Sequence, residues 1–128
     1  MFRGYKGQIL EIDLTQNSIS KTRLDLDSAK LFIGGRGMIS YLLWNRLKAG
    51  TDPLSPDNLL IFLTGPLTGI NTGSNQTCVG FKQPETGTIS HSITTGYWGP
   101  ELKFSGYDGV IITGKAREPV YIYIFSDQ

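Results

Sequence analysis

The sequence has very few of the residues that commonly bind metals or form crosslinks. In 128 residues there is one cysteine, Cys78, and one histidine, His91. A single cysteine excludes an internal disulfide, and it excludes an iron–sulfur cluster bound by this chain alone. An excess of one charge is also missing, because 12 Lys and Arg balance 11 Asp and Glu. The composition is therefore not that of a nucleic-acid binder or of a protein that binds acidic membranes.

Long apolar runs are absent as well. No stretch approaches the ~18 apolar residues that span a bilayer, and the first residues lead into a mixed segment, not into the apolar core of a signal peptide. We therefore expect a cytoplasmic protein with no membrane segment. The 39% of hydrophobic residues are typical of a folded chain. The length predicts a single domain over residues 1–128.

Glycine is the residue in excess. There are 16 glycines, and ten of them lie between Gly65 and Gly114. Glycine adopts backbone conformations that other residues avoid, and it lets another group approach the main chain closely. This half of the chain is therefore expected to contain repeated tight turns or a surface on which a ligand meets the backbone.

Hydrophobic periodicity predicts an α+β fold, made mainly of antiparallel β-sheet with two or three short helices. Strands are expected at residues 8–14, 19–24, 59–64, 76–82, 88–94, 110–113 and 120–125, and helices at 27–33, 37–48 and 100–105. Asp27 is expected to cap the first helix. The helix over 37–48 is apolar around most of its circumference, which predicts that it is mostly buried.

The expected strand at 120–125 is apolar on both faces. Val120, Ile122 and Ile124 alternate with three aromatic residues. Strands of this kind are normally covered on both sides. Two interpretations remain open: the aromatic face points outward, or a partner or a further part of the chain packs on it. The second interpretation would also allow self-association into a homo-oligomer.

The segment Gly34-Gly35-Arg36-Gly37 resembles a phosphate-binding loop at the start of a helix. Ser40, however, occupies the place of the third glycine of the dinucleotide fingerprint, and no Lys-Ser/Thr pair follows. We interpret the segment as a turn between two helices with Arg36 at the surface.

Two loops rich in small residues have the composition of an anion-binding surface. These are the run from Thr64 to Thr77 and the Thr94-Thr95-Gly96 loop. Small residues let main-chain amides converge on a ligand, and hydroxyl groups add donors. The phosphate groups of a cofactor would fit such a surface. The alternative is two glycine-rich hairpin loops without a ligand.

No catalytic constellation is present in the sequence. In Ser90-His91-Ser92, neighbouring residues of a strand point to opposite faces, so the imidazole cannot activate either hydroxyl. Cys78 lies on an expected strand without an adjacent base and is expected in the core. Glu101 and Asp108 flank a short helix, and their spacing alone does not predict an acid–base pair. The chain has the character of a binding domain, with no catalytic residue of its own.

The order of several motifs resembles the N-terminal domain of the tungsten-containing aldehyde:ferredoxin oxidoreductases. The resemblance runs colinearly across nearly all of the chain. The motifs that carry it are the strand from Gly4 to Leu14, Ile33-Gly34-Gly35-Arg36-Gly37, residues 52–58, Thr64-Gly65-Pro66-Leu67-Thr68-Gly69, residues 96–108, Gly114-Lys115-Ala116 and residues 119–124.

This resemblance implies a role within a much longer enzyme. In the family, the N-terminal domain consists of β-sheets that support a tungstopterin cofactor, a bis-molybdopterin with tungsten or molybdenum. Later domains supply one [4Fe–4S] cluster and the candidate catalytic acids. The complete enzyme oxidises an aldehyde to a carboxylic acid and passes electrons through the cluster to ferredoxin. The implied partners are therefore ferredoxin and the remainder of the polypeptide or a larger subunit, and the 128-residue chain alone is expected to be inactive.

The resemblance also implies cofactor contacts, with two departures from the family pattern. Where the family has a Gly-Gly-Arg segment whose arginine reaches the pterin, this chain has Ser74-Asn75-Gln76, one residue shorter. Gln76 is the expected contact there, without the charge of arginine. The family's Asn-Ser-Gly-Gly-like turn corresponds to Ile93-Thr94-Thr95-Gly96. The implied magnesium contact is the main-chain carbonyl of Ile93, facing an ion that bridges the pterin phosphates.

Two other classes of function remain open. The first is a non-catalytic scaffold or assembly domain of the same fold, which has lost the pterin contacts and docks a partner chain through residues 120–125. The second is a carbohydrate-binding module that uses Tyr97, Trp98 and Tyr107. The expected burial of these rings beside a helix argues against the carbohydrate-binding module.

Overall fold

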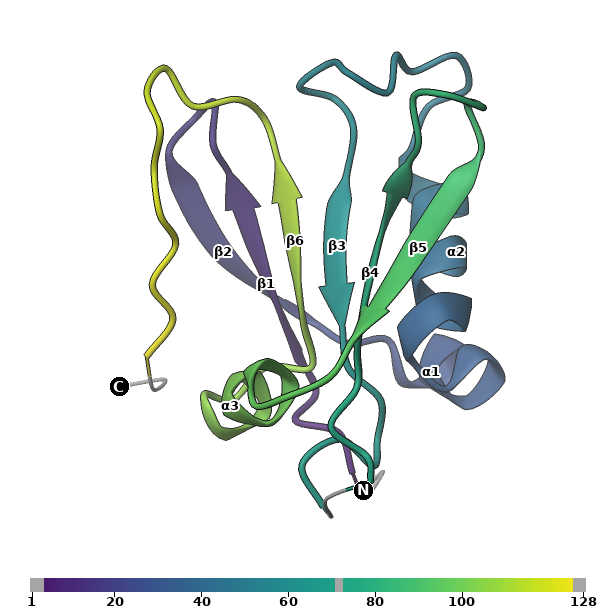
Figure 1. Ribbon diagram of the computed structural model, residues 1–128, viewed down its shortest axis with the longest axis vertical. Coiled ribbons are helices and arrows are strands. Elements are labelled where there is room, and N and C mark those ends of the chain that lie inside the picture. Colours follow the sequence, from purple (N-terminus) through teal and green to yellow (C-terminus); the bar gives the residue numbers. More distant parts are fainter. Residues whose placement is uncertain (1–3, 71–72, 126–128) are drawn as a thin grey trace.

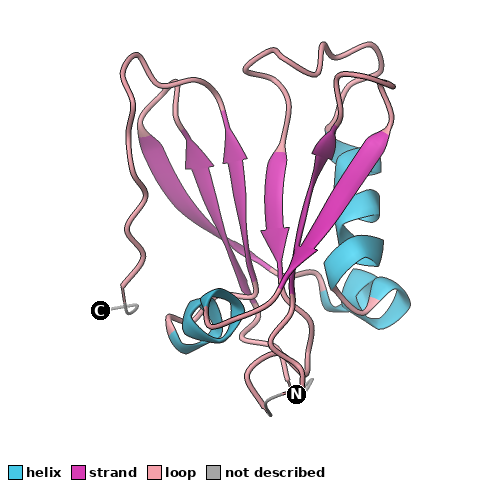
Figure 2. Cartoon of the chain, viewed as in Figure 1, coloured by secondary structure: helices cyan, strands magenta, loops and turns pink. Residues whose placement is uncertain are grey.

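The computed structural model describes residues 4–70 and 73–125 and shows one twisted sheet with helices on both faces (Figures 1 and 2). The strands are β1 Gln8–Asp13, β2 Ser18–Arg23, β3 Leu60–Leu63, β4 Thr77–Lys82, β5 Ile89–Thr94 and β6 Gly109–Thr113. The helices are α1 Leu26–Phe32, α2 Gly35–Arg46 and α3 Trp98–Phe104. The strand order is β2-β1-β6-β3-β4-β5.

The sheet is mixed but mostly antiparallel. β1 pairs in parallel with β6, from Ile9 opposite Gly109 to Asp13 opposite Thr113. All other neighbouring strands pair antiparallel. This confirms the predicted α+β fold with mainly antiparallel strands. The parallel pair joins the first strand to the last, and it brings residues about 100 positions apart in sequence side by side.

The predicted first hairpin is present and has a local cause. The Asp13 carboxylate accepts hydrogen bonds from the backbone N–H groups of Thr15 at 2.8 Å and Gln16 at 3.0 Å. Asn17 then adopts a positive φ of 51°, a conformation that asparagine tolerates better than most residues. The turn therefore follows directly from the polar residues between the two strands.

Two hydrophobic clusters lie on opposite faces of the sheet. The first packs beneath α1 and α2 and consists of Ile9, Leu24, Ala29, Met38, Ile39, Leu43, Leu59, Ile61, Leu63, Cys78 and Ile111. The second packs beside α3 and consists of Leu10, Ile12, Leu102, Tyr107 and Val110. The alternation of side chains along β1 and β6 supplies residues to both clusters, so these two strands are covered on both faces.

The helix boundaries differ from the sequence expectations. Asp25, not Asp27, caps α1, because its carboxylate accepts from the N–H groups of Asp27 and Ser28, both at 3.2 Å. Asp27 lies in the first turn, where it pairs with Lys30 at 2.9 Å. α2 begins earlier than expected, at Gly35, and it is not buried all round. Trp44 is 82% exposed, and only one face of the helix contributes to the core.

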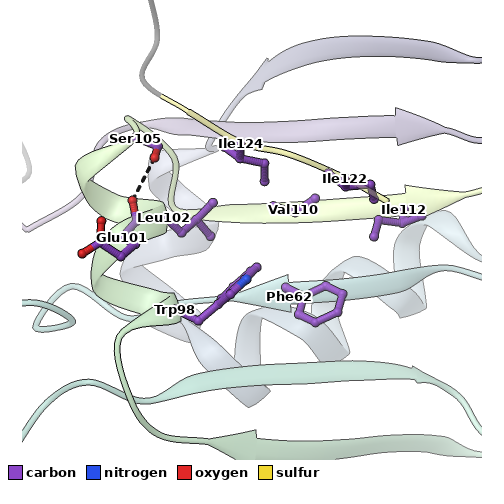
Figure 3. A pocket seen from close by; sticks show the side chains of 9 residues that line it. All are labelled: Phe62, Trp98, Glu101, Leu102, Ser105, Val110, Ile112, Ile122 and Ile124. Carbon is purple, nitrogen blue, oxygen red and sulfur yellow. Dashed lines mark hydrogen bonds between the residues drawn. The ribbon is translucent and has the colours of Figure 1, made fainter. Parts of the chain in front are cut away.

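The predicted last strand is wrong. Residues 120–125 belong to no strand of the sheet, although their side chains alternate as expected. Ile122 and Ile124 face the α3 side of the sheet (Figure 3). Tyr123 and Phe125 are exposed, with ring centroids 6.1 Å apart. β6 already has β1 and β3 on its two edges. The segment that follows β6 therefore cannot pair with it, and it packs over the face of the sheet.

Candidate functional site

Two glycine-rich segments and a residue near the end of β5 converge on one cavity of about 410 Å³. Its walls come from the end of β3, the start of β4 and the start of α2, which lie at the lower end of the sheet in Figure 1. The cavity is lined by Ile33, Gly34, Gly35, Arg36, Leu63, Thr64, Gly65, Pro66, Leu67, Thr68, Gly73, Ser74, Gln76, Cys78 and Ile93. The run from Thr64 to Thr77 expected to bind anions therefore borders a shared hollow, except that residues 71–72 lie outside the described residues.

The start of α2 is fixed against the end of β3. The Thr64 carbonyl accepts a hydrogen bond from the Gly35 N–H at 3.2 Å. A Cβ at Gly34 would lie only 2.6 Å from the same carbonyl oxygen, so any other residue would push the two segments apart. Thr64 is itself held by the Asp108 carbonyl, which accepts from the Thr64 N–H at 3.0 Å and from its hydroxyl at 2.7 Å.

Hydroxyl groups tie the loop after β3 to the segment before β4. The Thr68 hydroxyl accepts from the Gly65 N–H at 3.1 Å and donates to the Gln76 carbonyl at 3.3 Å. The Ser74 hydroxyl donates to the Leu67 carbonyl at 2.6 Å. These contacts keep Gln76 beside the loop, so the two segments form one continuous wall of the cavity.

The charge of the cavity wall is positive. Arg36 is the one charged residue among the described residues that line it, and its Nη1 lies 3.4 Å from Nε2 of His91 on β5. Burial raises the pKa of the Cys78 thiol, and the Arg36 charge opposes that shift. Cys78 is thus a protonated core thiol, as expected, and supplies no nucleophile.

The structure brings some of the expected contacts to the cavity and leaves others beside it. Gln76 and Ile93 line the cavity. Thr94, Thr95 and Gly96 follow Ile93 at the end of β5, are exposed, and do not contribute to the lining that the described residues form.

The sequence interpretation of Arg36 was correct for its exposed side chain and wrong for its element. Only Ile33 and Gly34 separate α1 from α2, and Arg36 lies in the first turn of α2. The local sequence pattern also did not place Arg36 at the same cavity as the second glycine-rich loop. The one available signal was the resemblance of Gly34-Gly35-Arg36-Gly37 to a phosphate-binding loop.

A buried ion pair between Lys103 and Asp108 holds residues that pack against the cavity wall from outside the cavity. Lys103 Nζ lies 2.8 Å from Asp108 Oδ1, and both side chains are almost completely buried. The Asp108 carboxylate also accepts from the N–H groups of Lys6 at 3.0 Å and Gly7 at 2.6 Å. Lys103 donates to the Gly4 carbonyl as well. Asp108 therefore has a structural role and does not form an acid–base pair with Glu101.

The segment that this ion pair holds, from Gly4 to Gly7, lies directly against the cavity wall. A Cβ at Gly4 would lie 2.6 Å from the Pro66 carbonyl oxygen. Gly4 thus packs on the loop after β3, at Pro66. The position of that loop depends on contacts made by residues far away in the sequence.

A second cavity of about 320 Å³ lies between α3 and the segment 120–125 (Figure 3). Its walls are mainly apolar, with the rings of Phe62 and Trp98 5.2 Å apart and the exposed Glu101 on α3. Tyr97 is 80% exposed, whereas Tyr107 is buried in the second hydrophobic cluster. The three aromatic residues considered for carbohydrate binding therefore do not form a common exposed surface.

Within residues 4–70 and 73–125, no three or more His, Cys, Asp and Glu side chains gather in a way that would bind a metal ion. None of the helices in the same described ranges is long and apolar enough to cross a membrane.

Comparison with known proteins places the chain in a family. Residues 9–128 match the family model described as aldehyde ferredoxin oxidoreductase, N-terminal domain. An aliphatic sulfonate oxidoreductase, WOR-like subunit, from Pyrococcus furiosus is 44% identical over 96% of this chain and 20% of its own length. A tungsten-containing aldehyde ferredoxin oxidoreductase from Pyrococcus abyssi is 44% identical over 97% of this chain and 21% of its own length.

A solved structure gives the same result for the fold. The active site complex BamBC of benzoyl coenzyme A reductase, with 1,5 dienoyl-CoA, contains a chain that is 42% identical and superposes with a TM-score of 0.95. The match covers 100% of this chain and 20% of that chain. The chain thus spans about a fifth of the length of these relatives. It belongs to the aldehyde ferredoxin oxidoreductase family and corresponds to the family's N-terminal domain.

Proposed function

We propose that this domain holds the pterin cofactor of a tungsten-dependent oxidoreductase. One observation supports this proposal above the others: two glycine-rich segments, residues 33–36 and the run from Thr64 to Thr77, meet at one cavity whose described wall has an arginine and no carboxylate. A pterin cofactor carries phosphate groups, and backbone amides, hydroxyls and guanidinium groups are the donors that phosphate prefers.

The residues present fit such a group. A Cβ at Gly65 would meet no atom closer than the Thr68 hydroxyl at 4.0 Å, so space is open beside the backbone there. A Cβ at Gly35 would meet only the Cys78 Cβ, at 3.7 Å. Glycine at these two positions leaves main chain accessible from the cavity, which favours a ligand recognised by many weak backbone contacts.

Within this proposal, the contacts implied by the family resemblance are divided between two walls. From the wall formed by the loop after β3, Gln76 would donate a hydrogen bond to the cofactor or accept one from it. Ile93 lines the cavity at the end of β5, and its main-chain carbonyl would hold magnesium. Thr94, Thr95 and Gly96 would add contacts from beside the cavity. The bound tungsten centre supplies the two-electron redox change, and the chain's own residues bind and orient the cofactor.

The complete enzyme is proposed to oxidise an aldehyde to a carboxylic acid. A [4Fe–4S] cluster in the remainder of the polypeptide would pass the electrons to ferredoxin. The names of the relatives indicate that this domain contributes little to the choice of substrate. Proteins named for aldehydes and for an aliphatic sulfonate, and a structure with a dienoyl-CoA, are all 42–44% identical to it. We infer that the domain carries what these enzymes share, the cofactor site, and that the substrate is selected elsewhere.

The test is to purify the complete polypeptide that carries these 128 residues and to measure tungsten, molybdenum and released pterin per chain. The proposal expects stoichiometric metal and pterin, together with aldehyde-dependent dye reduction. The 128-residue chain alone is expected to show no dye reduction. A complete polypeptide without pterin would contradict the proposal and would favour the non-catalytic scaffold domain.

A further inference from the structure

The first turn of α2 carries a positive charge at a position where negative charge is favoured. The N-terminus of a helix has a partial positive charge, so Asp and Glu are favoured there and Arg and Lys are not. In α2 the first turn contains Arg36 and no acidic residue, and no side chain caps the helix. His91 lies beside the guanidinium at 3.4 Å. A cation at this position is electrostatically unfavourable unless an anion compensates for it.

That anion is not supplied by the described part of the chain. None of the ion pairs found there involves Arg36, and its hydrogen-bond contact is the imidazole of His91. Arg46, at the other end of the same helix, differs in this respect. It binds the Glu11 carboxylate through both nitrogens, at 3.1 and 2.7 Å. The helix therefore has one arginine whose charge is neutralised within the fold and one whose charge faces a cavity.

The backbone amides near Arg36 offer further hydrogen-bond donors to an anion. The first N–H groups of a helix have no acceptor within the helix. The Gly35 N–H is used by the Thr64 carbonyl at 3.2 Å, which leaves those of Arg36 and Gly37 without an intrahelical acceptor. Arg36 can present up to five N–H donors in a planar arrangement that suits two oxygens of one phosphate.

We propose that Arg36, positioned by His91, binds a phosphate-type oxyanion in the cavity. The inference rests on the proposed cofactor site and names its charged phosphate contact. With Nε2 of His91 as the acceptor, the imidazole holds one guanidinium N–H and leaves the others to the oxyanion. Gln76, which has no charge, then needs to supply only a neutral hydrogen bond from the opposite wall.

The first experiment measures binding of inorganic pyrophosphate to the 128-residue chain by calorimetry. The variants are Arg36→Gln and Arg36→Lys, with Arg46→Gln as the matched control on the same helix. Loss of a charge-assisted contact is expected to weaken binding about tenfold or more in Arg36→Gln. Arg36→Lys is expected to recover part of the affinity, and Arg46→Gln to bind like the wild type. Circular dichroism checks that all variants are folded.

Three results would overturn the inference. The first is equal affinity of Arg36→Gln and wild type, and the second is no pyrophosphate binding by the wild type. The third is an equal loss in Arg46→Gln, which would reveal only a general effect of net charge.

The second experiment separates this inference from the proposed function. The complete polypeptide is purified with and without Arg36→Gln, and its pterin content is measured. Lower pterin content in the variant, together with weaker pyrophosphate binding, supports both. A wild-type polypeptide that lacks pterin but binds pyrophosphate through Arg36 overturns the proposed function and supports the oxyanion site. Full pterin content in Arg36→Gln overturns the assignment of this oxyanion to the cofactor.

Discussion

Two cations of this domain, Lys103 and Arg36, have opposite environments. Lys103 is 4% exposed, and its charge is neutralised by Asp108 at 2.8 Å. Arg36 is exposed at a cavity wall, with an imidazole beside it and no carboxylate partner in the described part of the chain.

This difference distinguishes a charge that stabilises the fold, that of Lys103, from one that is available to a ligand, that of Arg36. An unpaired charge in the protein interior is strongly unfavourable, so a buried Lys103 requires its partner within the chain. Water screens an exposed guanidinium, which can therefore remain without a carboxylate until a ligand binds. The buried pair fixes the loops that form the cavity, and the open arginine gives the cavity its charge.

The largest expected effect comes from breaking the buried pair. Lys103→Met leaves the Asp108 carboxylate without its counter-charge, and the loss in free energy of unfolding should be about 3–5 kcal/mol. Urea denaturation measures it. Lys30→Met, which removes an exposed ion pair with Asp27, is the control and should lose less than about 1 kcal/mol. Equal losses in the two variants would show that the buried pair has no special role.

Adding a methyl group at Gly34, where α2 and β3 lie close together, should have the next largest effect. A Cβ at Gly34 would meet backbone atoms at 2.6 and 3.0 Å, so Gly34→Ala must displace one of the two segments. We expect a loss of about 1–3 kcal/mol, as for overpacked sites, together with weaker pyrophosphate binding.

Gly87→Ala is the control for this substitution. Its φ is 68°, and a Cβ there would meet no atom within 4 Å. It should cost about 1–2 kcal/mol through backbone conformation alone and leave binding unchanged. Loss of binding in Gly87→Ala, or normal binding in Gly34→Ala, would contradict the assignment of the cavity.

Arg36→Gln should change stability and binding in opposite directions. Removing a cation from the positive end of α2 is expected to raise the free energy of unfolding by about 0.3–1 kcal/mol, even though pyrophosphate binding falls. Arg46→Gln should instead lower stability, because Arg46 lies at the negative end of the helix and pairs with Glu11. Thermal unfolding at low salt measures both. A destabilised Arg36→Gln would indicate that Arg36 serves the fold.

The smallest effect concerns the pH dependence of the Glu11–Arg46 pair. Hydrogen bonds from Arg46 are the main reason why the pKa of Glu11 lies below its ordinary value of 4.5, and burial acts in the opposite direction. A lowered folded-state pKa adds stability above the unfolded-state value, and this stability is lost as the pH falls through the folded-state pKa. The difference between wild type and Glu11→Gln should therefore be present at pH 7, below about 1 kcal/mol, and absent in acid. Urea midpoints between pH 3 and 7 would test it, and a difference that grows in acid would contradict it.

Local sequence patterns predicted much of the fold. The first hairpin follows from the alternation along β1 and the polar turn after Asp13, and the hairpin of β4 and β5 follows from the turn at Gly87. The parallel pairing of β1 with β6 could not be predicted in this way, because it joins residues that no local signal relates. The same is true of residues 120–125, whose alternation is that of a strand although they have no strand partner in the described sheet.

The candidate site shows the same limit. The composition of the loops around Thr68 and Gln76 predicted an anion-binding surface, since glycine and hydroxyl residues are visible in the sequence. That Arg36 belongs to the same cavity depends on how α2 packs against β3 and β4, a tertiary contact. The exposed arginine was therefore a correct local prediction, whereas its place in the first turn of α2 and its relation to the second loop required the structure.

The most direct test of this account is a crystal structure of the complete polypeptide with its cofactor bound. We predict that a pterin phosphate lies between the first turn of α2 and the loop after β3, with the Arg36 guanidinium in hydrogen-bond contact. A cofactor whose phosphates lie away from this cavity, with Arg36 paired to a carboxylate of another domain, would contradict the account.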